Sequence, residues 1–233
     1  MVRTPLNLTD ANLQIESLVG LTVSLPWKGY GSAIFLELGV LSPIQHPRQH
    51  HKQGEACISI EWDWRIEEGS KVVCGSSNSR PTIKREVEAL CGETIEELSI
   101  HGEVPELLIH FSGGKRLISA AMLAGYPRWS IRLSSETWMA CDEGVIHVGD
   151  GEETGITPEE KAVFDHAEIT AERWGIPVAA SVEGKCEQCE CFISIDGDGH
   201  LLDYGVCTSR ESPLDGRAVH LKSCCAAFSS IAD

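Results

Sequence analysis

Six of the ten cysteines lie close together near the end of the chain, between residues 186 and 225. Cys186 and Cys189 have the C-x2-C spacing with which one turn of backbone presents two thiolates to a single metal ion. Zinc takes four such ligands in a tetrahedron, so two more thiolates must come from elsewhere in the chain. Cys207 and Cys225 can supply them, which gives the pattern C-x2-C-x17-C-x17-C. These four cysteines, called the four-cysteine set below, predict a structural Zn2+ site.

The sequence leaves two questions open, namely which residue is the fourth ligand and whether the cysteines bind metal at all. Cys224, Cys191 and His220 compete with Cys225 for the fourth position. Disulfides would need an oxidising compartment. The first residues carry no apolar stretch of a secretory signal, so we expect a cytoplasmic protein. Cysteines also occur as small buried residues that bind nothing. The Asp215-Gly216 dipeptide favours a tight turn that would return the chain toward the last cysteines.

The motifs around these cysteines are, in order, Cys-x-x-Cys, Tyr-Gly-Val-Cys-Thr, Ser-Pro-x-Asp-Gly-Arg-x-Val and Cys-Ala-Ala-Phe. This series resembles a small cysteine-rich module, of rubredoxin-like or zinc-knuckle type, that is found in uncharacterised bacterial proteins. Matched residue by residue, the four family cysteines fall on the four-cysteine set, whereas Cys224 occupies the place of a family glycine. The resemblance is confined to this stretch, and it implies a metal-binding knuckle without implying an activity.

The whole chain is acidic, since 19 Lys and Arg residues and 35 Asp and Glu residues give a formal net charge of −16. Negative charge repels phosphate, so nucleic-acid binding through a zinc ribbon is disfavoured. No apolar run reaches the ~18 residues of a membrane-spanning helix, and a hydrophobic content of 42% is ordinary for a globular protein. The acidity either serves solubility alone or attracts a basic protein partner through complementary charge.

Strand-like runs with alternating apolar residues precede this region and predict a mainly antiparallel β domain. The clearest alternation spans residues 58–66, and Glu67-Glu68-Gly69 is the expected turn into a return strand. A helix is expected from Pro81, which suits the first helical position, to Leu90, and Gly92 would end it. One face of the alternating run carries the apolar residues Ile58, Ile60, Trp62, Trp64 and Ile66.

Short matches at a period of roughly 72 residues indicate one β-unit used twice. Two such units, of about residues 18–75 and 90–144, could pack with pseudo-two-fold symmetry. Chance similarity between short strands is the alternative explanation. The matched segments are residues 18–23 with 90–95, 34–39 with 107–113, and 57–64 with 129–138.

A connecting helix is expected between the β domain and the cysteines. Thr157 can cap a helix that starts at Pro158, and Glu160 would complete a capping box. Gly175 would end the helix, whose apolar stripe is Val163, Phe164, Ala167, Ala171 and Trp174. The fold class expected is therefore α+β, with a loosely attached start at residues 1–14. The domains expected are a β-rich domain of residues 1–150, a linker and helix of residues 151–180, and a zinc-knuckle module of residues 181–233.

Residue patterns of known catalytic sites are missing from the sequence. It carries no motif of nucleotide-binding loops, serine hydrolases or zinc proteases, and we predict no catalytic residues. His46, His50 and His51 are interpreted as exposed loop residues rather than as a second metal site. The other cysteines are interpreted as buried thiols, namely Cys57, Cys74, Cys91 and Cys141.

The two indoles of the alternating run either belong to the core or contact a partner. The nearby carboxylates likewise form either a solvated face or part of a binding surface. The candidate binding residues are Trp62, Asp63, Trp64, Glu67 and Glu68. Short motifs of the N-terminal domain also resemble bacterial immunity proteins, which neutralise polymorphic toxins by binding them. These motifs are Gly31-Ser32, Trp62-Asp63-Trp64-Arg65, Leu90-Cys91-Gly92, Pro105-Glu106-Leu107, Phe111-Ser112-Gly113-Gly114 and Trp129.

Taken together, these features favour a cytoplasmic bacterial binding protein, of immunity type, that is not an enzyme. Its partner would be a basic protein, its zinc would be structural, and it would bind neither nucleic acid nor membrane. The alternative is a zinc-dependent enzyme in which three cysteines bind the metal and a water molecule takes the fourth position.

Overall fold

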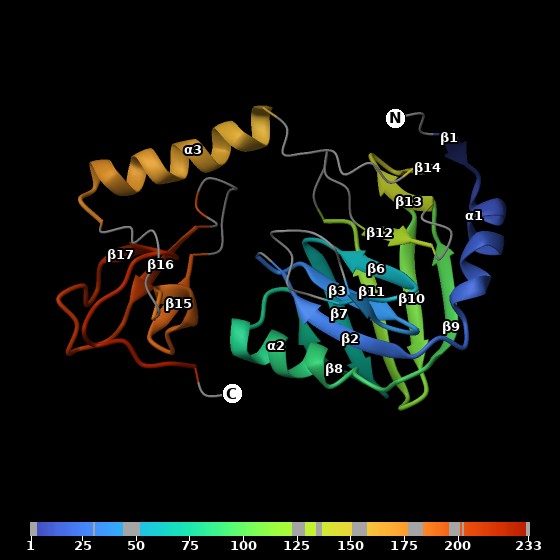
Figure 1. The fold of residues 1–233 in the computed structure, drawn as a ribbon, viewed down its shortest axis with the longest axis horizontal. Helices are drawn as coiled ribbons and strands as arrows, with labels where there is room; N and C mark the ends of the chain where they lie inside the picture. Colours follow the sequence, from blue (N-terminus) through green and yellow to red (C-terminus); the bar gives the residue numbers. More distant parts are fainter. Residues whose placement is uncertain are drawn as a thin grey trace. The chain divides into compact units, whose positions relative to one another are not determined.

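The computed structural model describes two compact units, residues 1–152 and 153–233. Strands dominate the N-terminal unit, helices are few, and every strand pair in the described residues is antiparallel, as expected for the antiparallel sheet of the α+β prediction (Figure 1). No helix in the described chain has the length and apolar character that crossing a bilayer requires. The described residues are 4–29, 31–43, 52–122, 129–133, 137–150, 158–176, 184–195, 201 and 203–231.

The larger sheet of the N-terminal unit has seven strands in the order β1-β14-β13-β12-β6-β3-β2. A separate two-stranded ribbon pairs β4 (Ser42–Pro43) with β5 (Lys52–Gln53). The seven strands are β1 (Thr4–Leu6), β2 (Val23–Lys28), β3 (Ile34–Leu38), β6 (Ala56–Ile60), β12 (Trp129–Arg132), β13 (Thr137–Asp142) and β14 (Val145–Asp150).

The second sheet of this unit has five strands in the order β8-β7-β11-β10-β9. Helix α1 (Leu8–Ile15), which continues into the 3-10 helix η1 (Glu16–Leu18), packs against β9, while α2 (Arg80–Glu88) packs against β2 and β8. The five strands are β7 (Asp63–Glu68), β8 (Lys71–Gly75), β9 (Ile95–His101), β10 (Glu106–Phe111) and β11 (Lys115–Ala120).

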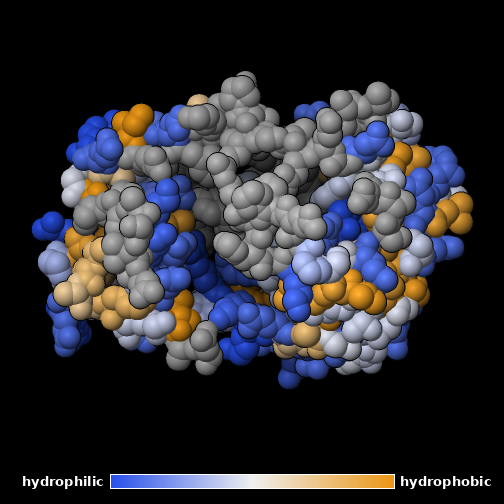
Figure 2. All heavy atoms as spheres, viewed as in Figure 1, coloured by the Kyte–Doolittle hydropathy of each residue, from blue (hydrophilic) through white to orange (hydrophobic). Residues whose placement is uncertain are grey.

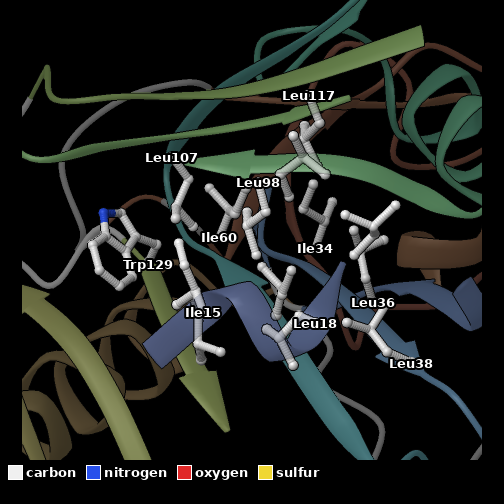
Figure 3. Close-up of a cluster of buried hydrophobic side chains, with 14 of the residues drawn as sticks. Ile15, Leu18, Ile34, Leu36, Leu38, Ile60, Leu98, Leu107, Leu117 and Trp129 are labelled. Atoms are coloured by element: carbon white, nitrogen blue, oxygen red, sulfur yellow. The ribbon is translucent and has the colours of Figure 1, made fainter. Parts of the chain in front are cut away.

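Both sheets and both helices contribute to one hydrophobic core. Ile15 of α1, Ile60 of β6 and Leu107 of β10 belong to the same cluster of buried side chains (Figure 3). The buried indole of Trp129 donates its Nε1 hydrogen to Pro105 O at 3.0 Å, so this large side chain leaves no polar group unpaired. The predicted helix at residues 81–90 corresponds to α2 with the turn that follows it.

The alternating run at residues 58–66 is two strands, not one. β6 belongs to the seven-stranded sheet and β7 to the five-stranded sheet. The chain changes direction at Trp62, whose φ of 63° lies in the left-handed region that a residue with a Cβ adopts only at a cost. Ile58, Ile60, Trp64 and Ile66 of the predicted buried face are buried, whereas Trp62 at the break is half-buried and β6 buries both of its faces. Periodicity could not locate this break, because the apolar alternation continues through it.

The start of the chain is tied down, contrary to the expectation for residues 1–14. Strand β1 pairs with β14, and Asn7 caps α1 by accepting a hydrogen bond from Asp10 N at 2.9 Å. The Asn12 side chain bonds both backbone groups of Ile100 on β9, at 2.8 and 2.9 Å. These contacts are long-range in sequence, so local composition did not indicate them.

The two segments that begin at Gly20 and Gly92 meet through hydrogen bonds that repeat at a spacing of 72 residues. Thr22 and Thr94 form an antiparallel bridge at the centre. Gly20 and Gly92 have φ of 90° and 88°, a conformation that favours glycine. The four bonds are Gly20 N to Ile95 O (2.8 Å), Gly92 N to Val23 O (2.9 Å), Val23 N to Glu93 O (2.8 Å) and Ile95 N to Leu21 O (3.0 Å).

The strands that follow Gly20 and the strands that follow Gly92 are arranged in the same order. β2, β3 and β6 lie consecutively in the larger sheet before the chain crosses to β7, and β9, β10 and β11 lie consecutively in the smaller sheet before it crosses to β12. The counterpart of β6 in this order is β11. The strand order therefore differs from the sequence match of residues 57–64 with 129–138, which pairs β6 with β12, its hydrogen-bonded neighbour in the larger sheet.

The C-terminal unit contains helix α3 (Pro158–Arg173), the 3-10 helix η2 (Cys186–Gln188) and a three-stranded sheet in the order β15-β16-β17. The strands are β15 (Phe192–Ser194), β16 (Tyr204–Cys207) and β17 (Ala218–His220). Buried Ala171 of α3 packs with buried Tyr204 of β16, and the Trp174 ring lies 5.4 Å from the Tyr204 ring. The helix thus belongs to the same compact unit as the cysteines, with Gly175 at its end (φ 68°).

Candidate metal centre

The four-cysteine set lines one small pocket in the C-terminal unit. Cys186 begins η2 and Cys189 directly follows it, Cys207 is the last residue of β16, and Cys225 comes after β17. Three segments that are separate in sequence therefore meet at one place. Val219, Phe192 and Phe228 add an apolar lining, and three of the four cysteines are less than 9% exposed.

Backbone hydrogen bonds hold the first three cysteines. Cys189 N donates to Cys186 O at 3.0 Å, which closes the turn expected of C-x2-C. Cys186 N donates to Ser223 O at 2.7 Å and so ties η2 to the segment after β17. Gly216 N donates to Cys207 O at 2.8 Å, and Gly216 has φ of 70°, as the Asp-Gly turn between β16 and β17 requires.

Cys225 is held by contacts that the sequence analysis did not predict. Ser212 Oγ donates to Cys225 Sγ at 3.3 Å, and Ser212 is itself buried. Phe228 N donates to Cys225 O at 3.3 Å, and the Phe228 ring lies so near Gly184 that a Cβ there would come within 3.1 Å of it. Ser212 belongs to the Ser-Pro-x-Asp-Gly motif, and this motif is the feature of the sequence that could have indicated its role at the site.

His220 is not a ligand candidate, because strand alternation sends it to the opposite face of the sheet. Tyr204 and His220 are register partners and share one face, whereas Cys207 and Val219 share the other face, which is the pocket side. His220 Nδ1 accepts from Lys222 N at 3.1 Å, and His220 is 1% exposed.

The two remaining cysteines of this region differ in position. Cys224 is not among the residues that line the pocket, whereas Cys191 is. Both are partly exposed. Burial, followed by repulsion from the neighbouring Cys189 and Cys207 thiols, raises the pKa of Cys191. The geometry thus leaves Cys191 as the one competitor of Cys225 from the original three.

The thiols of the four-cysteine set influence one another electrostatically. The pKa of Cys186 is raised to about 12, chiefly by burial and then by the nearby thiols of Cys189, Cys207 and Cys225, in that order. A buried thiolate next to other thiolates is unfavourable unless a cation compensates the charge. Thiolate sulfur is the donor that zinc prefers in closed structural sites, so the donor chemistry fits this metal.

The thiols line the pocket without converging on one point. Within the described residues, no three side chains of His, Cys, Asp or Glu are arranged as a ready-made metal group. Zinc binding would thus require the sulfurs to turn inward, and rotation about a single χ1 bond moves each of them.

The candidate binding residues of the N-terminal unit occupy different environments. Trp64 is 3% exposed and donates its Nε1 hydrogen to Ser32 O at 2.7 Å, so it belongs to the core and is not available to a partner. Trp62 and Asp63 are half-buried, and Glu68 is exposed. Of the five candidate residues, Trp64 is therefore part of the core, whereas Trp62 lies between β6 and β7 and the other four lie on β7 itself.

Glu67 is also less available than the sequence suggested. Its carboxylate accepts from Arg65 at 2.7 Å and from Arg116 at 2.6 Å. The hydrogen bond from Arg65 lowers the pKa of Glu67, and the Arg116 charge acts in the same direction. The negative charge of Glu67 is therefore compensated by two cations on its own sheet.

The cysteines of the N-terminal unit are buried thiols with one exception. Cys57, Cys74 and Cys141 are buried, and burial raises the pKa of both Cys57 and Cys74. Cys91 is exposed, contrary to prediction, because it lies in the turn after α2 rather than in the helix. The predicted histidine loop of His46, His50 and His51, the linker at residues 151–157, and the side chains of Val163, Phe164 and Ala167 lie outside the described residues.

The comparisons with known proteins concern the C-terminal unit alone. A family model described as a protein of unknown function (DUF3027) matches residues 161–232, which include most of α3, the three-stranded sheet and all of the four-cysteine set. No curated protein and no solved structure gives a significant match to the chain.

Proposed function

We propose that the C-terminal unit is a structural zinc module in which Cys186, Cys189, Cys207 and Cys225 fill all four positions of the metal. The observation that carries the proposal is that three segments distant in sequence bring these four thiols to one pocket. With four protein ligands the metal would keep no open position for substrate, and its contribution would be to the stability of the unit.

The small size of the hydrophobic clusters supports a structural role for a metal. One cluster is formed around buried Ala171 and Tyr204, on the helix side of the sheet. The other is formed around Cys186, Cys207 and Val219, so two of its three buried members are themselves proposed ligands. Units this small gain little from apolar burial alone and often depend on a metal.

The protein as purified from cells is expected to contain one zinc ion per chain. Replacing Cys225 by Ser should remove the zinc, because serine is a poor zinc ligand and only three of the proposed ligands would remain. Elemental analysis by mass spectrometry measures the zinc content. The matched control is Cys224→Ser, next to Cys225 but not at the pocket, which should keep its zinc.

The same pair of variants distinguishes the zinc-dependent enzyme with three cysteine ligands. In that case Cys225→Ser would retain zinc, since water rather than Cys225 would occupy the fourth position. Wild-type protein that contains no zinc when grown with the metal would contradict both versions of the proposal.

We further propose that the whole chain is a binding protein of immunity type that neutralises a basic toxin by direct contact. Its support is the net charge of −16 together with the immunity-like motifs of the N-terminal unit. Hydrophilic side chains surround separate apolar patches on the face seen in Figure 2. Complementary charge accelerates association and selects among partners.

If the gene next to this one encodes a basic toxin, its binding to this chain should be sensitive to salt. Affinity measured by calorimetry should fall as ionic strength rises, because salt screens exposed charges. Reversing the charge of exposed Glu68 should weaken binding if β7 contributes to the interface, whereas Glu88→Lys, on exposed α2, serves as the control of equal charge. Absence of both binding and protection from that toxin would rule out the immunity role.

A further inference from the structure

Cys191 is a fifth thiol at the pocket of the four-cysteine set. Zinc needs only four ligands, so a closed site would leave one of the five thiols without metal. Cys191 is more exposed than Cys186, Cys189 and Cys207, which are all buried. A reagent from solution therefore reaches Cys191 before it reaches those three.

The backbone holds Cys191 between two of the proposed ligands. Phe192 N donates to Cys189 O at 3.1 Å, which places Cys191 in the same tight turn as Cys189. Phe192 is the register partner of Cys207 across β15 and β16. Thr208, which follows Cys207, holds the backbone of Cys191, since its N and its Oγ1 both donate to Cys191 O, at 2.9 and 3.0 Å.

We propose that Cys191 is an oxidation site through which a peroxide releases the zinc, an inference that rests on the proposed zinc site. The oxidant is the peroxide itself. The exposed thiol reacts first, and a proposed ligand on one side of it then completes a disulfide. Zinc would be left with three cysteines and would dissociate, because its closed coordination is lost.

The atoms and electrons of this reaction balance. The Cys191 thiol gives up its proton, and the thiolate attacks one oxygen of hydrogen peroxide. The O–O bond breaks, and the hydroxide that leaves takes up a proton, so sulfenic acid and water form. The thiolate of Cys189 or Cys207 then attacks that sulfur, the S–O bond breaks, and hydroxide leaves and takes up a proton to become water. Overall two thiols are oxidised to one disulfide, and one peroxide is reduced to two waters.

The experiment follows zinc release from the intact protein with a chromogenic chelator after addition of hydrogen peroxide. Wild type and Cys224→Ser should release zinc at similar rates, while Cys191→Ser should release it roughly tenfold more slowly, since the pocket then lacks its one partly exposed thiol that is not a proposed zinc ligand. Peptide mapping of the oxidised wild type should find a disulfide between Cys191 and either Cys189 or Cys207. Cys224→Ser is the matched control, because Cys224 is also partly exposed but does not line the pocket.

Zinc content before oxidation separates failure of this inference from failure of the zinc site. Untreated wild type without zinc would overturn the proposed function. Untreated Cys191→Ser that lacks zinc would show that Cys191 is a ligand, which contradicts the inference. Equal release rates from zinc-loaded wild type and zinc-loaded Cys191→Ser would also overturn it.

Discussion

Removal of zinc is expected to unfold the C-terminal unit and to leave the N-terminal unit folded. Structural zinc sites supply about 10–16 kcal/mol of apparent binding free energy in small zinc-finger domains at neutral pH, and this becomes folding free energy. The measurement is amide hydrogen exchange of the full chain, with and without a strong chelator. Amides of β15, β16 and β17 should lose protection, whereas those of β6 and β12 should keep it.

The physical reason lies in the different cores of the two units. In the N-terminal unit both sheets and two helices share one cluster of buried side chains, so its stability does not depend on a metal. In the C-terminal unit Cys186 and Cys207 occupy part of the core themselves. Zinc-free protein with unchanged protection at β16 would contradict the structural role. Restoring protection by added zinc, but not by magnesium, is the control, because magnesium prefers oxygen ligands.

Replacing Glu37 by Ala should destabilise the N-terminal unit by about 3–5 kcal/mol, because it would leave a buried cation without its partner. Arg132 Nη2 lies 3.1 Å from Glu37 Oε2, and both side chains are at most 10% exposed. Glu37 Oε2 also accepts from Gly54 N at 2.8 Å, and Arg132 donates to the carbonyls of Gly54 and Glu55. The pair thereby joins β3 and β12 to the chain before β6.

Urea unfolding followed by tryptophan fluorescence measures this effect. The matched control is Glu67→Ala, since Glu67 pairs with Arg65 and Arg116, which are 43% and 40% exposed, and such pairs are worth about 1 kcal/mol or less. The double variant Glu37→Leu with Arg132→Met should recover most of the loss, because it removes both charges. A cost for Glu37→Ala no larger than that for Glu67→Ala would refute the assignment.

Local features of the sequence predicted α2, α3 and the meeting of the cysteines, but not α1. Pro158 and Gly175 mark the beginning and the end of α3, because the first fits the opening helical turn and the second adopts positive φ. The C-x2-C turn and the Asp-Gly turn depend on residues close in sequence, and they bring the first three thiols to the pocket.

Features that depend on distant contacts were not predictable in this way. The change of sheet at Trp62 is set by pairing of β6 with β12 and of β7 with β11, strands that lie far along the chain. The burial of Trp64 follows from that change of sheet. Periodicity cannot choose between His220 and Cys225 until the register of β16 and β17 is known.

The bridge between Thr22 and Thr94 has a consequence for how this protein can be divided. Residues before and after Leu90 each contribute strands to both sheets, and the pairs β1 with β14, β6 with β12 and β7 with β11 join one part to the other. A chain cut there would leave three newly unpaired strand edges on each fragment, and such edges promote aggregation. The two parts are therefore expected to fold and unfold together, and a shortened protein that still folds must contain all of residues 1–152.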